Sequence, residues 1–362
     1  MLKVKQPSQV YIEGHAGNIA MMRIKGDRVV SKCLDSKFNR ETKWKKKSST
    51  VVKCNNIVAE LVKNNKIVLP RSTSISKKHI NQAKKEVKIS IQTEVKEKWD
   101  NKVHKLVMQG NFAKLLIEEK ENATWQSIAN KMPRNVLAFA TRISTNSLPS
   151  PDNLKRWGKR KISTCPLCRN PHGTLAHLVN ICPVALKQQR FTWRHDSVLQ
   201  HLTKEVKKLA TEDTQVFSDL PGHMINCTTI PADILVTSGE GSKPDLVLIN
   251  RRERKIALLE LTCPLENNIQ KAHDKKALKY TQLQLDLQEK GFQVQLVPFE
   301  VGSSGHITKH TRKSLEDVLK IYSIRMKPQI VQNLAKISLL CTMSIFHAYQ
   351  TSEWVSPPLL EP

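Results

Sequence analysis

The chain has 362 residues, enough for two or three units that each bury a core. Its 59 Lys and Arg against 32 Asp and Glu leave a net charge of +27, which favours a polyanionic partner, nucleic acid before an acidic membrane surface. A run of about 20 apolar residues, as a membrane-spanning helix requires, is absent from the sequence, so we expect no membrane partner.

The N-terminal residues 1–77 are polar and basic, with weak apolar periodicity, and we expect a weakly ordered extension there. The chain begins without the apolar core and cleavage site of a secretion signal. Its eight cysteines do not form the dense framework of a small secreted domain, so we expect a reducing compartment. With DNA as the expected partner this points to the nucleus. The basic run 43–47 could be an import signal, although a run this short is usually a solvated face.

Residues 78–160 have the pattern of a helical linker. Apolar residues recur at three- and four-residue steps from Lys78 to Glu121, which predicts an amphipathic helix. A further helix is predicted from Trp125 to Ile143, interrupted at Pro133.

Residues 161–192 contain four candidate zinc ligands within eighteen positions: Cys165, Cys168, His177 and Cys182. Two thiols separated by two residues fit one turn, and a histidine and a third thiol complete a tetrahedral shell. Such a closed shell predicts structural Zn²⁺ rather than a catalytic site. His172 is a weaker alternative ligand, because Pro171 and Gly173 on either side indicate the tip of a turn.

Residues 193–362 change from a helical to an α/β pattern. An amphipathic helix is predicted from Trp193 to Leu209. Short apolar runs then predict strands at 234–237, 246–249, 256–261 and 294–299. Helices are predicted at 268–288, 315–321 and 330–349. This order describes an α/β fold with a mixed sheet flanked by helices.

Two carboxylates in this region are candidates for a Mg²⁺ site. Asp245 begins one predicted strand and Glu260 lies near the end of the next, so a hairpin around 250–254 would bring them together. Mg²⁺ held there could activate water for phosphodiester hydrolysis. Lys276 and Lys279 lie on one face of the following helix and could supply a basic group, with Tyr280 beside them. Taken singly, each of these features is more often a turn, a strand end or a solvated helix face.

Together these motifs resemble the C-terminal region of site-specific non-LTR retrotransposon proteins, which carry a zinc knuckle and a restriction-like endonuclease behind the reverse transcriptase. The resemblance covers residues 95–350. It rests on the Cys/His cluster, Arg194-His195-Asp196, Lys243-Pro-Asp245, Glu260-Leu-Thr262, Lys276-Ala-Leu-Lys279-Tyr280 and Phe299-Glu-Val-Gly302, which occur in the order typical of the family.

The resemblance implies a PD-(D/E)XK core in which the lysine has moved from the position of Thr262 to the following helix. Asp245 and Glu260 would then bind Mg²⁺, and Lys276 or Lys279 would be the catalytic base. The residues Arg194, His195, Lys243 and Tyr280 would contact nucleic acid. Such an enzyme nicks target DNA so that the exposed 3′-OH primes reverse transcription.

The chain also departs from the family. It has no Asp-Asp pair, so the carboxylate motif of a polymerase palm is missing, and we interpret it as a retrotransposon-derived fragment. The alternative function is a catalytically inactive remnant that binds nucleic acid through the knuckle and basic helices. A third hypothesis is that element RNA is the main partner, with Trp157 and Trp193 stacking on bases, although we expect both tryptophans to be core residues. The sequence does not predict the oligomeric state.

Overall fold

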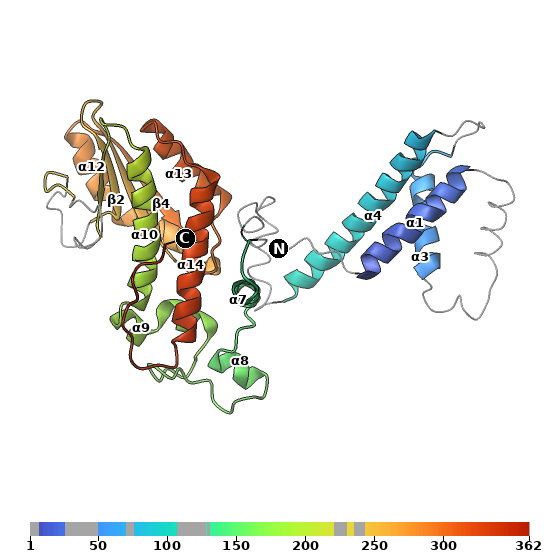
Figure 1. The fold of residues 1–362 in the computed structure, drawn as a ribbon, viewed down its shortest axis with the longest axis horizontal. Coiled ribbons are helices and arrows are strands. Elements are labelled where there is room, and N and C mark those ends of the chain that lie inside the picture. Colours follow the sequence, from blue (N-terminus) through green and yellow to red (C-terminus); the bar gives the residue numbers. More distant parts are fainter. Residues whose placement is uncertain are drawn as a thin grey trace. The chain divides into compact units, whose positions relative to one another are not determined.

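The computed structural model describes residues 7–25, 50–69, 76–106, 128, 131–220, 230–234 and 243–361. The chain divides into two units, with the boundary after Lys105 (Figure 1). The candidate import signal at 43–47 lies outside the described residues, as does the part of the predicted helix beyond position 106.

The N-terminal unit contains three described helices, α1 (Pro7–Lys25), α3 (Thr50–Lys63) and α4 (Lys77–His104). They share a core in which Ala16 and Ala20 of α1 meet Val58 of α3 and Val87 of α4. The structure therefore has packed helices where we expected a weakly ordered extension, and α4 belongs with them rather than with a linker. Small residues such as alanine allow helices to approach closely, but they add little to an apolar pattern, which explains why α1 was missed.

Among the described residues of the second unit, five helical segments precede the sheet: α7 (Arg134–Ser144), α8 (Pro151–Arg156), the π-helical turn η2 (His177–Ile181), α9 (Pro183–Lys187) and α10 (Arg190–Leu209). Helix α7 begins directly after Pro133, where we predicted an interruption. Proline is accepted there because the first helical N–H groups need no intrahelical partner.

A four-stranded mixed sheet forms the centre of the second unit, which confirms the predicted α/β class. Its strands are β1 (Gln215–Ser218), β2 (Leu246–Asn250), β3 (Lys255–Thr262) and β4 (Gln293–Glu300), in the order β1-β2-β3-β4. The first three strands are antiparallel, and β4 runs parallel to β3. Strand β1 was not predicted. Ile234, the first residue of the predicted strand 234–237, lies in a turn, and the other three residues lie outside the described part of the chain.

The connection from β3 to β4 consists of η3 (Glu266–Asn268), α11 (Ile269–Lys279) and α12 (Thr281–Glu289). We predicted one continuous helix, but the helix breaks at Tyr280. The Tyr280 side chain is fully buried, and its hydroxyl donates a hydrogen bond to the Lys243 carbonyl at 2.7 Å. The break between α11 and α12 therefore coincides with a residue that is anchored to the chain before β2.

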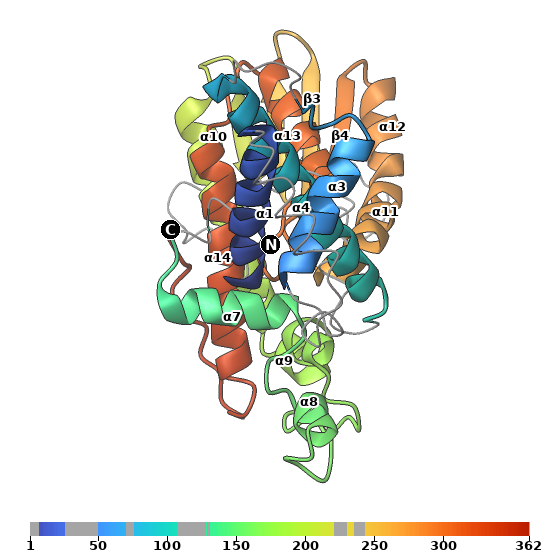
Figure 2. The same ribbon diagram turned by 90° about the vertical axis from the view of Figure 1, so that its right-hand side faces the viewer.

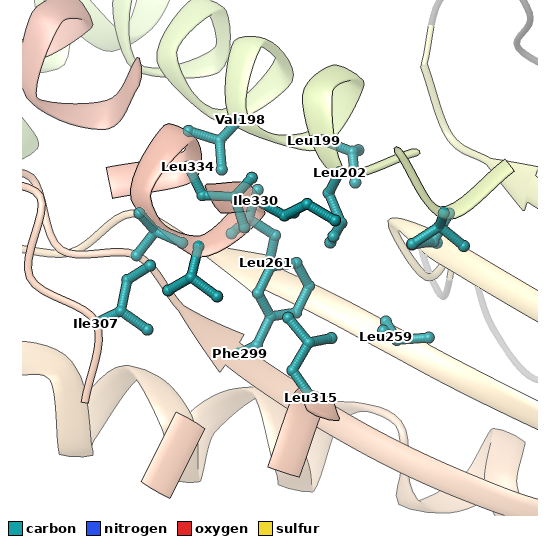
Figure 3. Close-up of a cluster of buried hydrophobic side chains, with 14 of the residues drawn as sticks. Val198, Leu199, Leu202, Leu259, Leu261, Phe299, Ile307, Leu315, Ile330 and Leu334 are labelled. Carbon is teal, nitrogen blue, oxygen red and sulfur yellow. The ribbon is translucent and has the colours of Figure 1, made fainter. Parts of the chain in front are cut away.

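The two faces of the sheet are covered by different helices. Alternate residues of β3 such as Ala257 and Leu259 face a core shared with α10, α13 (Lys309–Ile321) and α14 (Pro328–His347). Figure 3 shows this core, with Leu261 and Phe299 of the sheet beneath Val198 of α10 and Leu334 of α14. The intervening residues, Ile256 and Leu258, face α12 and Tyr280. The even-numbered residues of β3 therefore point toward the face of the sheet that α11 and α12 cover.

Helix α14 links the sheet core to a second core. Leu339 and Phe346 pack with Phe139 of α7 and Leu178 of η2, and Figure 2 shows α7 lying across α14. Within the described residues, α14 alone is long and apolar enough to cross a membrane by length and composition, and 61% of its apolar window is buried in the protein.

Candidate functional site

The Cys165–Cys168 pair lies on a tight turn that begins the zinc ligand cluster. The Arg169 amide donates to the Cys165 carbonyl at 3.0 Å, and the Cys165 amide donates to the Asn170 carbonyl at 2.8 Å. Arg169 has a φ of 62°, in the left-handed region, which lets the chain reverse directly after the second thiol.

The other two ligands come from the π-helical turn η2. The Cys182 amide donates to the His177 carbonyl at 2.8 Å, closing a turn of five residues. The Thr174 hydroxyl accepts from the His177 amide at 3.1 Å and fixes the start of the turn. This widened turn brings the imidazole and the third thiol to the same side of the chain.

The four ligand atoms of Cys165, Cys168, His177 and Cys182 lie within 4.8 Å of one another, and Cys168 Sγ is 3.1 Å from His177 Nε2. A tetrahedral zinc site has ligand–ligand distances of about 3.8 Å, so the cluster fits Zn²⁺ with little movement. His172 is exposed and is not part of the cluster.

The pKa shifts of His177 and Cys182 have opposite consequences for metal binding. Burial lowers the pKa of His177, which favours the neutral imidazole that coordinates a cation. Burial and the neighbouring thiols Cys165 and Cys168 raise the pKa of Cys182 to about 11, although the amides of Ala185 and Val184 favour its thiolate. A bound cation would offset the cost of thiolates this close together.

Residues 91–188 match the family of zinc-binding domains in reverse transcriptase. The matched segment contains the whole Cys₃His cluster and ends before α10. The chain therefore has a reverse transcriptase-related zinc-binding domain, in which the donor set supports Zn²⁺. No curated protein matches the chain. Within this domain we call residues 151–188 the zinc module.

Arg194 joins the zinc module to the sheet and is fully buried. Its guanidinium donates to the Val179 carbonyl of η2, to the Thr342 hydroxyl of α14 and to the Cys263 carbonyl beyond β3, each at 3.0 Å. Burial lowers the pKa of Arg194. These bonds occupy the side chain inside the protein, so our expectation that Arg194 contacts nucleic acid is corrected to a structural role.

Outside the matched segment, the β2–β3 hairpin brings the two candidate Mg²⁺ ligands together. The register pairs Leu246 with Leu259, and one further step sets Asp245 opposite Glu260. The Asp245 amide donates to Glu260 Oε2 at 3.2 Å, and the Leu261 amide donates to Asp245 Oδ2 at 2.7 Å. The predicted hairpin is confirmed, and we call these two carboxylates the acid pair.

The structure separates the two candidate lysines. Lys276 donates a hydrogen bond directly to Glu260 Oε1. Lys279 instead donates to the Tyr280 hydroxyl at 2.9 Å and lies over the Tyr280 ring. Burial and the charge of Asp245 raise the pKa of Glu260, and the ammonium group of Lys276 acts in the opposite direction. Lys276 is therefore the lysine that belongs to the acid pair.

The predicted nucleic-acid contacts have different surroundings. Tyr280 is buried, with its hydroxyl bonded inside the protein, so it is a core residue rather than a surface contact. His195 is partly buried, and its ring bridges Asp196 Oδ1 at 3.0 Å and Asp245 Oδ2 at 3.2 Å. Burial lowers the pKa of His195, but the hydrogen bonds to these carboxylates outweigh it and raise the pKa well above its ordinary value. Lys243 is exposed two residues before Asp245.

A further polar group near the acid pair was not assigned from the sequence. Glu300 ends β4 and is buried, its carboxylate bonded to His273 Nδ1 at 2.9 Å and to the Thr311 hydroxyl at 2.7 Å. The register pairs Glu300 with Thr262, whose buried hydroxyl has no hydrogen-bond partner within the described residues. The alternation of β4 could have shown that Glu300 faces α11, but its partners on α11 and α13 required the tertiary fold.

The two tryptophans that flank the zinc ligands in the sequence differ in burial. Trp193 is buried, with its indole N–H donating to the Pro358 carbonyl at 3.3 Å and its ring edge against Trp354. Trp157 is 42% exposed. The core assignment is therefore correct for Trp193 and wrong for Trp157.

Proposed function

We propose that the chain is a divalent-metal-dependent DNA endonuclease, a retrotransposon-derived fragment that nicks nuclear target DNA to start target-primed reverse transcription. The observation that carries this proposal is the β2–β3 register, which sets Asp245 opposite Glu260 with Lys276 in contact. An antiparallel hairpin, a helical crossover and a parallel returning strand are consistent with the PD-(D/E)XK core that the motifs resemble.

The donor set of the acid pair suits Mg²⁺, which prefers carboxylate oxygens and keeps water or phosphate as its remaining ligands. Within the described residues, Asp245 Oδ1 has no hydrogen-bond partner, so a lone pair remains for a cation. Asp245 and Glu260 would hold the ion. When bound, Mg²⁺ would lower the pKa of a coordinated water and offset charge on the phosphate.

The neighbouring residues have separate roles in this proposal. Lys276 offsets the charge of Glu260 and would favour the developing negative charge of the phosphate. His195 and the Leu261 amide fix the orientation of Asp245 through its Oδ2 atom. Lys243, exposed beside the acid pair, would contact a phosphate of the DNA backbone.

The alternative, an inactive nucleic-acid-binding remnant, is favoured by one specific observation. The Glu260 side chain is only 2% exposed, and its oxygens are already engaged by Lys276 and the Asp245 amide. A metal would have to compete with this ion pair. In that case the zinc module and basic helices would bind nucleic acid while the sheet served as a scaffold.

Plasmid nicking by zinc-loaded protein, with and without added Mg²⁺, separates these functions. We expect conversion of supercoiled to open-circular DNA that requires Mg²⁺ and is lost in Asp245→Asn and Glu260→Gln. Asp213→Asn is the matched control, because Asp213 is an exposed carboxylate away from the acid pair. Equal background from all variants, with DNA binding retained, would reject the nuclease and support the remnant.

A further inference from the structure

Trp157 is an exposed aromatic side chain on the zinc module, eight residues before the first metal ligand in the sequence. It directly follows α8 and is 42% exposed, whereas Trp193, which follows the last ligand in the sequence, is buried. A large flat apolar ring exposed to water is accessible for stacking against a flat ligand. Trp157 is the one Trp, Phe or Tyr among residues 151–188.

The backbone holds Trp157 in a fixed position. The Lys159 amide donates to the Leu154 carbonyl at 2.8 Å, and the Gly158 amide donates to the Lys155 carbonyl at 2.9 Å. With Gly158 at a φ of 69°, this pair of bonds is a Schellman motif that ends α8 at Trp157. The α8 N-terminus is fixed as well, because the Ser150 hydroxyl accepts from the Asn153 amide at 3.3 Å. The indole is thus presented from an ordered turn.

Positive charge surrounds this turn without carboxylates to balance it. Lys155, Lys159 and Lys161 are exposed, and within the described residues none of them takes part in an ion pair or a side-chain hydrogen bond. The sequence has no Asp or Glu between Asp152 and Asp196. Asp152 itself lies in the first turn of α8, at the opposite end from Trp157.

We propose that this turn is a binding platform for single-stranded nucleic acid, on which Trp157 stacks against an unpaired base while Lys155, Lys159 and Lys161 contact phosphates. An aromatic ring among unbalanced cations fits a polyanion that also carries flat apolar rings. Duplex DNA would satisfy the lysines, but its stacked bases would leave the indole without a partner. This platform is separate from the acid pair and does not depend on cleavage.

Binding of fluorescein-labelled oligo(dT) and oligo(U) twelve-mers to the full chain tests the platform, with a duplex of equal length as comparison. Because the proposed nuclease also binds duplex DNA, the measured quantity is the effect of each variant on single-strand affinity compared with its effect on duplex affinity. Trp157→Ala should weaken single-strand binding about 5- to 150-fold, the effect of losing one stacked base, while Trp157→Phe should retain most of it. Leu186→Ala, which removes a side chain 59% exposed in the same module, should bind like wild type.

The lysines have a distinct signature in the salt dependence. Replacing Lys155, Lys159 and Lys161 together by Gln should reduce the slope of log affinity against log salt by about 2, at about 0.7 per single-strand phosphate contact. Replacing the exposed Lys313, Lys320 and Lys327 of the other helices should leave the slope nearly unchanged. Retained zinc content shows that each variant keeps the folded module.

Two results would overturn the platform: Trp157→Ala that binds both single strands within twofold of wild type, or Trp157→Ala that loses as much affinity for the duplex as for the single strands. Quenching of tryptophan fluorescence by oligo(dT) gives an independent readout, because a stacked base should quench Trp157. The quenching should disappear in Trp157→Phe, and its persistence there would also reject the proposal. Nicking activity enters none of these measurements, so the platform and the nuclease are tested separately.

Discussion

The backbone amide of Asp245 donates a hydrogen bond to the carboxylate of Glu260 at 3.2 Å, across the open end of the β2–β3 hairpin. The two acids are therefore held together by strand register. A site of this kind is ordered in advance, which lowers the reorganisation required for metal-assisted catalysis.

The nuclease proposal predicts that the two lysines of α11 differ. Lys276→Ala removes the cation in contact with Glu260 and should reduce the nicking rate by about 100-fold or more, the usual effect of removing one transition-state charge. Lys279→Ala loses a contact with Tyr280 and should change the rate by less than about threefold. The rates are measured under single-turnover conditions. A larger loss of rate in Lys279→Ala than in Lys276→Ala would contradict this assignment and give the catalytic role to Lys279.

Removal of a zinc ligand should unfold the zinc module. Cys182→Ser should abolish zinc binding, measured by metal analysis of the purified protein, because three ligands remain for a site that needs four. The loss should lower the melting temperature, since Leu178 and Val179 between the ligands pack in the same core as Phe139 and Phe346. His172→Ala is the control and should retain zinc. Loss of the metal in that variant would change the assigned ligand set.

Arg194 should contribute to stability rather than to nucleic-acid affinity. Arg194→Met removes the buried donor to the Val179 carbonyl and the Thr342 hydroxyl, and one of the two donors to the Cys263 carbonyl, and should cost about 3 kcal/mol in the free energy of unfolding, measured by urea denaturation. The exposed Arg325 offers a matched control, whose replacement by Met should change stability by less than about 0.5 kcal/mol. Similar stabilities for the two variants would show that Arg194 is not a structural link.

His306 should make the protein less stable in acid. It is fully buried, and burial lowers its pKa to about 4, against about 6.5 in an unfolded chain. Between these values the unfolded chain binds a proton that the folded protein does not, so stability falls as pH falls, by up to about 3 kcal/mol near pH 4. Since carboxylates also titrate there, the measurement is the difference between wild type and His306→Gln. The difference in the free energy of unfolding between wild type and His306→Gln should change with pH between about 4 and 6.5, whereas the stability of His172→Gln should follow that of wild type. A difference that stays constant over this range would contradict the prediction.

The spacing of residues in the sequence was sufficient to predict two parts of the structure, the zinc ligand cluster and the β2–β3 hairpin. The zinc cluster lies within eighteen residues, so the order of its ligands already limits their geometry. The β2–β3 hairpin has a short turn, and its register follows from the apolar runs on either side. The coarse α/β class followed from the alternation of these patterns.

Other parts depended on tertiary contacts. The resemblance implied that Arg194 and Tyr280 contact nucleic acid, yet each side chain donates to buried acceptors from distant segments. The spacing of Lys276 and Lys279 places them on the same helix face, so the sequence does not distinguish their roles. Their different partners, Glu260 of β3 and Tyr280, are known only from the tertiary structure. Strand β1 has four residues, too few for a periodic signal to stand out.

The Cys263 carbonyl accepts hydrogen bonds both from Asn180 of the zinc module, at 2.9 Å, and from Arg194, at 3.0 Å. It lies three residues beyond Glu260 on the same chain. A chelator that strips zinc would therefore release the end of the strand that carries one of the two acids. Inhibition by EDTA would then have two possible causes, the loss of Mg²⁺ and the displacement of Glu260 after the loss of zinc. Adding Mg²⁺ to zinc-loaded protein separates the two causes.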